Sequence, residues 1–141
     1  MTRTSLDAVT LLYKHVKESE LITGAKRVNG GLYKGKRPIN STKEDVVINS
    51  LPLNYAQLQE GVLNMNIYVR NLTLTLSGVT DNTQPDLARL SELTAIAIDF
   101  VREIDGPDAE YTFALQQDNL IEGDNNDHYV NLRIEFYSTN I

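Results

Sequence analysis

Two histidines and a group of acidic residues are the side chains that could perform acid–base or metal chemistry. His128 follows Asp127, but a catalytic dyad also needs a nucleophile positioned by a third group, and the sequence identifies none. His15 has no second histidine or acid at ligand spacing, so we interpret it as a surface residue. The connection 118–128 is acidic but lacks the residue order of an EF-hand calcium loop; its acids are Asp118, Glu122, Asp124 and Asp127. We therefore predict neither a catalytic nor a metal site.

Two further patterns could bind a metal or a phosphate. Asp99 and Glu103 are four residues apart on a predicted helix, but no second helix supplies the Glu-x-x-His pattern of a di-metal site. Glycines alternate with basic residues over 24–37, yet neither GxGxxG nor GxxxxGK[ST] is present, and no strand-to-helix turn follows. We expect no cofactor, and the basic cluster is better interpreted as a solvated or partner-facing arm. We predict that the protein is not an enzyme.

Length and composition limit the class of protein. A chain of 141 residues is predicted to form one domain, 1–141, with a core large enough to be stable without disulfides or metals. It has no cysteine, which excludes disulfides and thiolate metal sites. The first residues are too charged for a signal peptide, and no apolar run is long enough to span a membrane. We expect a soluble intracellular protein with no membrane partner.

Charge is divided between the two parts of the chain. Residues 1–80 contain ten Lys and Arg against six Asp and Glu, a net charge of +4. Residues 81–141 contain three against thirteen, a net charge of −10, which together give the total of −6. This asymmetry favours either a basic surface for nucleic acid or two complementary faces in a head-to-tail oligomer, unless folding mixes the charges on one surface.

A long helix over about 86–105 is the element around which the rest is expected to pack. Pro85 and Asp86 begin it, and Gly106 and Pro107 end it. Its apolar residues have helical spacing: Leu90, Leu93, Ala97, Phe100 or Val101, and Ile104. A second helix over about 5–18 has an apolar stripe of Leu6, Val9, Leu12, Tyr13 and Val16.

Strands are predicted on both sides of the long helix. They cover 44–51, 61–70, 110–117 and 129–138, and 71–84 either prolongs the second or forms a short strand of its own. Two of them alternate cleanly, with Leu63, Met65, Ile67 and Val69 inward in one and Val130, Leu132, Ile134 and Phe136 inward in the other. The prediction is an α+β fold, in which both helices pack on one face of a mixed or antiparallel sheet.

Two segments are candidates for contact with a partner or another subunit. The segment 21–43 is predicted to be an extended basic arm or an edge hairpin, with Lys34, Lys36, Arg37 and the following Lys43 as contact residues. The connection 52–60 is unusually apolar, with Leu53, Tyr55 and Leu58. These side chains either pack on their own domain or are reserved for another chain.

The order of elements and two local runs resemble a known family. Helix, basic arm, two strands, long helix and terminal hairpin is similar to the layout of bacteriophage tail-terminator or tail-completion (neck) proteins, including those encoded by prophages. The run KRPINSTKEDVVINSLPLN looks like small prophage proteins of this kind, through Arg37, Pro38, Asn40, Ser41, Glu44 and Asp45. The strand HYVNLRIEF is similar too.

The resemblance implies a structural virion protein without catalytic residues. Six copies would form a ring that caps the tail tube at its head-proximal end, with tube and neck proteins as partners. Such a protein would reside in the bacterial cytoplasm during assembly and then in the virion. The alternative is a head–tail adaptor or another small binding module that contacts nucleic acid through the basic arm, although the overall acidity disfavours nucleic acid.

Overall fold

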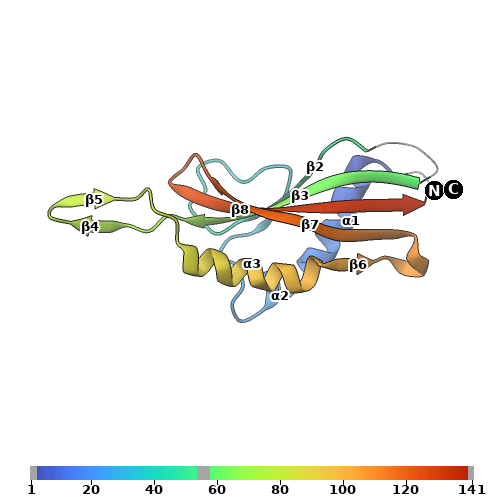
Figure 1. Cartoon of the computed structure of the whole chain (residues 1–141), viewed down its shortest axis with the longest axis horizontal. Helices are drawn as coiled ribbons and strands as arrows, with labels where there is room; N and C mark the ends of the chain where they lie inside the picture. The colour runs from blue at the N-terminus through green and yellow to red at the C-terminus, as the bar shows by residue number, and fades with distance from the viewer. Residues whose placement is uncertain (1–2, 54–57, 140–141) are drawn as a thin grey trace.

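The computed structural model describes residues 3–53 and 58–139 and has an α+β fold (Figure 1). Its elements, in chain order, are α1 (Ser5–Lys17), α2 (Glu20–Thr23), β1 (Leu32–Lys34), β2 (Val46–Ser50), β3 (Leu58–Arg70), β4 (Leu74–Leu76), β5 (Val79–Asp81), α3 (Leu87–Val101), β6 (Glu103–Asp105), the 3-10 helix η1 (Pro107–Ala109), β7 (Tyr111–Glu122) and β8 (Asp127–Thr139). No helix in these described ranges has the length and apolar character needed to cross a membrane.

Six strands form one mixed sheet in the order β1-β2-β3-β8-β7-β6. β1 pairs with β2 in parallel, and every other pair is antiparallel. The two longest strands, β3 and β8, are in register from Leu58 opposite Thr139 to Arg70 opposite Asp127. The long central pair therefore joins the middle of the chain to its last strand.

The helices cover one face of this sheet, as predicted. All eight side chains predicted to point inward from β3 and β8 are buried, and they form one core with α1, α2 and α3. Over these stretches of β3 and β8 every second residue is buried, because successive strand residues point to opposite faces of the sheet. One residue of the α1 stripe was wrongly predicted: Leu6 is 76% exposed, and Ala8 is buried with Val9, Leu12 and Val16. Leu6 lies in the first turn, outside the stripe that these four residues define.

The long helix is shorter than predicted. Asp86 caps α3 by accepting a hydrogen bond from the Arg89 backbone N–H at 3.2 Å. Leu90, Leu93, Ala97 and Val101 are buried, as expected, but the helix ends at Val101. Residues 103–105 form β6, where Ile104 pairs with Phe113 of β7 and packs in the core. Pairing with a strand from later in the chain therefore overrides the helical spacing of Ile104.

The segment 21–43 is more structured than an extended arm. It contains the single turn α2 and then β1, which lies at the sheet edge, as the glycine-rich pattern indicates, but pairs in parallel with β2 instead of forming a hairpin. A parallel pair needs a crossover, and residues 35–45 supply it. Arg37 of this crossover lies 4.1 Å from the ring centroid of Tyr68. Tyr68 alternates with the buried Ile67 and Val69, so the crossover covers the sheet face opposite the helices.

The terminal hairpin is longer than predicted, and its turn is only residues 123–126. Asp118 and Glu122 belong to β7 and Asp127 begins β8, so the acidic connection expected over 118–128 is mostly strand. A register shift between Leu115 and Gln117 changes which residues of β7 face the helices. After this bulge Leu120 is opposite Val130, on the helix side, and Asn119 is opposite Asn131, on the other side.

Residues 71–84 form a separate hairpin, β4 and β5, which projects from one end of the molecule (Figure 1). Its two-residue turn has positive φ at both central positions, 53° at Ser77 and 79° at Gly78. This is the type I′ geometry that matches strand twist, and Gly78 adopts it without steric cost. Of the two alternatives left open by the sequence, the short separate strand is confirmed.

Candidate functional site

Opposite edges of the sheet carry opposite charge. The edge strand β1 presents Lys34, and the crossover that follows it presents Lys36 and Lys43, all exposed; we call these three residues the basic edge. Lys34 donates to Thr10 Oγ1 at 3.2 Å and lies 4.9 Å from the Tyr13 ring centroid, which holds it against α1. Three of the predicted contact residues are thus exposed, one on the edge strand β1 and two on the crossover.

The opposite edge is formed by β6, η1 and the outer side of β7. It presents five exposed acids, which we call the acidic edge: Glu103, Asp105, Asp108, Asp118 and Glu122. The charge asymmetry of the sequence therefore remains a separation in space, because the basic and acidic segments form the first and last strands of the sheet order. Some charges of the two halves do pair, as in Arg3 with Glu110, Lys26 with Glu92 and Arg37 with Asp127, but the three lysines and these five acids stay on different elements.

Arg37 has a different position from the three lysines. Its guanidinium is 14% exposed and lies between two buried carboxylates, with Nε 2.9 Å from Asp45 Oδ2 and Nη1 2.6 Å from Asp127 Oδ2. It also donates to the Lys43 carbonyl at 2.9 Å. The expectation that Arg37 contacts a partner is therefore revised: its hydrogen-bonding groups anchor the crossover within its own subunit.

One residue of the apolar connection, Leu53, packs within its own subunit. Leu53 is buried in the core, close against Gly61, where an added Cβ would lie 1.9 Å from Leu53 Cδ2. Of the two alternatives for this segment, Leu53 thus packs on its own domain. Leu58 is the first residue of β3, and Tyr55 lies outside the described residues. Gly61 leaves the space that Leu53 fills.

Neither histidine is arranged for catalysis. His128 Nδ1 lies 2.6 Å from Asn71 Oδ1, while Asp127 is directed to the other sheet face, where Arg37 binds it. His15 was predicted to be a surface residue, but it is half-buried, and its Nε2 lies 3.0 Å from Tyr111 Oη. Within residues 3–53 and 58–139, no group of three or more acidic or histidine side chains is placed to hold a metal ion.

A second ion network ties α3 to the start of β2. Arg89 binds both carboxylate oxygens of Glu44, with Nε–Oε2 2.7 Å and Nη2–Oε1 2.8 Å, and donates to the Arg27 carbonyl at 2.9 Å. Burial raises the pKa of Glu44, but hydrogen bonds from Arg89 and from the Asn29 backbone N–H outweigh this and leave the pKa below its ordinary value. The hydrogen bonds to Glu44 also raise the pKa of Arg89.

This network predicts a loss of stability in acid. A carboxyl whose pKa is lowered by folding stabilises the fold above its ordinary pKa, and this contribution disappears as the pH falls through the lowered pKa. We expect Glu44→Gln to cost about 1 to 3 kcal/mol at pH 7 and much less at an acidic pH below the lowered pKa, where Glu44 itself is protonated. Urea unfolding at both pH values measures the difference. An equal cost at both would contradict this role.

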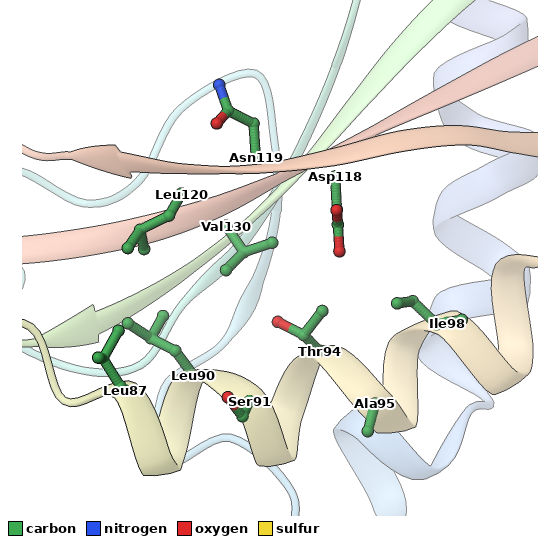
Figure 2. Close-up of a pocket in the computed structure, with 10 residues that line it drawn as sticks. All are labelled: Leu87, Leu90, Ser91, Thr94, Ala95, Ile98, Asp118, Asn119, Leu120 and Val130. Atoms are coloured by element: carbon green, nitrogen blue, oxygen red, sulfur yellow. The ribbon is translucent and has the colours of Figure 1, made fainter.

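An apolar groove lies between α3 and the far half of β7 (Figure 2). It has a volume of about 420 Å³. Figure 2 shows Leu120 and Asp118 pointing from β7 toward the helix, while Asn119 points away. The apolar lining residues are Leu87, Leu90, Ala95, Ile98, Leu120 and Val130. Sequence reasoning missed this groove, because the bulge in β7 that turns Leu120 toward α3 has no local sequence signal.

Comparison with known proteins assigns the chain to no family. No protein-family model matches the chain, and no curated protein matches it.

Proposed function

We propose that this chain is a structural phage or prophage protein of the tail-terminator type, whose copies form a ring at the head-proximal end of the tail. The observation that carries the proposal is the separation of charge onto two opposite sheet edges. A ring needs a head-to-tail contact between two different patches of the subunit, and opposite charges select that contact over a twofold one.

Two other observations support this function. The α+β layout and the KRPINSTKEDVVINSLPLN run carry the family resemblance, and the crossover 35–45 contains the first part of this run. Arg37 and Asp45 of the run bind one another, so these two residues of the run stabilise the fold of the subunit. A structural protein that acts through its surface needs no reactive residues.

A nucleic-acid-binding adaptor is the second candidate, and the basic residues of the first half support it less well. Arg37 is held by Asp45 and Asp127, and Lys26 lies 3.5 Å from Glu92. Phosphate binding needs cations that exchange counterions for phosphates, and these side chains already have protein partners. Binding to DNA that weakens steeply with salt would favour this candidate.

A charge-swap experiment tests the head-to-tail contact. Variant one carries Lys36→Glu and Lys43→Glu, and variant two carries Glu103→Lys and Asp105→Lys. We expect each variant alone to associate about tenfold more weakly than the wild type, since each contact then brings like charges together. Variant one is then acidic at both pairs of positions, and variant two is basic at both. An equimolar mixture should recover association, because in a ring where the two variants alternate every contact joins an acidic pair to a basic one. Light scattering over a wide concentration range measures the mass, and negative-stain images show closure.

The control is a chain carrying all four substitutions, which should associate as the mixture does. Closed rings, most tellingly of six subunits, support the proposed function. Twofold dimers, or variants that associate as well as the wild type, would contradict it.

A further inference from the structure

The β4–β5 hairpin carries exposed apolar side chains that do not belong to the core of the described residues. Leu74, Leu76 and Val79 share one face with Asp81, because Leu74 pairs with Asp81 and Leu76 with Val79 across the hairpin, and Thr75 and Thr80 share the other. The Asp81 carboxylate accepts hydrogen bonds from the Thr83 backbone N–H and hydroxyl at 2.8 and 2.6 Å. Leu76 is 80% and Val79 68% exposed. A lone two-stranded hairpin is marginally stable in water, and clustered exposed apolar residues mark interaction sites. This face therefore needs a partner.

The root of the hairpin is held firmly. Asn71 is buried, donates through Nδ2 to the Asn82 carbonyl at 2.9 Å, and through its backbone N–H to the Asn126 carbonyl at 2.8 Å. Leu72 N–H donates to the Gln84 carbonyl at 2.9 Å and closes the base. With the type I′ turn at the tip, these bonds preset the hairpin as a projecting arm, which reduces the entropy lost when it binds.

The groove beside β7 offers a matching surface on the acidic edge. β6 covers β7 only from Thr112 to Ala114, so the backbone of β7 beyond Leu115 has no neighbouring strand on that side among the described residues. Leu87 and Leu120 line the groove and are 57% and 43% exposed. An unpaired strand edge beside an apolar groove is the arrangement used for binding by strand addition.

Charge indicates what fills the groove. Residues 71–80 contain no ionisable side chain, and the one acid of the hairpin, Asp81, already accepts hydrogen bonds from Thr83 and Gln84. The exposed Arg70 at the hairpin root is opposite in charge to Asp118 of the groove and to Glu122 beside it. The lysines of the basic edge would bring charge into apolar surroundings, at a cost in desolvation. The hairpin is thus the segment of this chain whose polarity and charge fit the groove.

We propose that the β4–β5 hairpin of one copy binds in the groove between α3 and β7 of a second copy. The hairpin lies beside residues 116–122 of β7, with Leu74, Leu76 and Val79 directed into the groove. This inference rests on the self-association that the proposed function requires, and it adds a hairpin–groove contact to the contact between the basic and acidic edges. Since groove and hairpin are different patches, the contact is head-to-tail.

Disulfide trapping tests this contact directly, because the chain has no cysteine of its own. One copy carries Leu76→Cys, and a second copy, lengthened by a tag, carries Leu120→Cys. Each copy has one thiol, so a disulfide of mixed size joins two copies. The control partner carries Thr42→Cys, at an exposed position of the crossover. We expect the hairpin–groove disulfide to form at least about tenfold faster than the control disulfide, because docking raises the local thiol concentration.

A second variant measures the contribution of the apolar face. Leu74→Ser, Leu76→Ser and Val79→Ser together should weaken self-association at least about tenfold while leaving the melting temperature unchanged, since these side chains are exposed in the subunit. The matched control changes the other face, with Thr73→Ser, Thr75→Ser and Thr80→Ser, and should associate as the wild type does.

The outcomes separate this inference from the proposed function. Closed rings together with no excess of the hairpin–groove disulfide over the control would overturn hairpin docking and leave the ring intact. An enriched disulfide in open filaments would support hairpin docking and contradict the tail-terminator ring. If the three-serine variant associates normally, the hairpin does not make the contact.

Discussion

Arg37→Ala is expected to lower the free energy of unfolding by about 3 to 5 kcal/mol. The substitution removes the guanidinium that lies between Asp45 and Asp127 and leaves two buried carboxylates without a counter-charge. The Ser41 and Lys43 carbonyls of the crossover also lose a donor. Urea unfolding at neutral pH measures the loss, and Lys36→Ala, one residue away and exposed, should change stability by no more than about 0.5 kcal/mol.

A second comparison separates the removal of one charge from the removal of the whole cluster. Replacing Arg37 by Met together with Asp45 and Asp127 by Leu removes all three charges, and this chain should recover most of the lost stability. A loss below about 1 kcal/mol for Arg37→Ala alone would show that water reaches and compensates the carboxylates. The result also matters for assembly experiments, because a substitution at Arg37 weakens the fold itself, whereas substitutions at Lys36 and Lys43 test the surface alone.

Phe113→Ala is expected to cost about 3 to 5 kcal/mol. The ring is fully buried and lies 5.1 Å from the ring of Phe136 and 5.6 Å from that of Tyr111, measured between centroids. His15 of α1 contacts the same cluster at 6.5 Å. Removing the ring leaves a cavity between the sheet and the helix, and surrounding side chains fill it only partly.

Denaturant unfolding of Phe113→Ala beside Phe113→Leu tests this packing. The leucine variant keeps part of the apolar volume and should lose less stability than the alanine variant. Leu120→Ala, in the exposed groove of the same strand, serves as the matched surface control and should cost well under half as much. Equal losses at Phe113 and Leu120 would mean that the groove is as important for folding as the core.

Local patterns in the sequence predict most of the fold. The alternating residues of β3 and β8 and the helical spacing in α1 and α3 identify the core, because burial on one face imposes a period of 2 or 3.6. The α+β class with helices on one sheet face is confirmed. The errors occur where distant parts of the chain meet. Residues 103–105 become a strand because β7 pairs with them, and no local signal shows this.

The surface features are less accessible from sequence. Arg37 looks like one more residue of a basic run, and its partner Asp127 is 90 positions away, so only the fold brings the two charges together. The groove depends on a one-residue bulge in β7, and the hairpin stands free because its root, not its strands, is anchored. The exposure of Lys34, Lys36 and Lys43 could be predicted from residue type, because exposed lysines need no partner to stay at the surface.

The position of β8 affects the order of events during synthesis. This strand follows every other strand in the chain but lies in the sheet interior, between β3 and β7. While a ribosome makes the chain, the β1–β3 part and the α3–β7 part have no common strand until β8 emerges. The sheet closes only then, and the basic and acidic edges become fixed at opposite sides of one body. We expect a nascent chain that lacks β8 to remain unfolded and to depend on chaperones. If the chain assembles as proposed, copies that lack β8 would not take part in the ring.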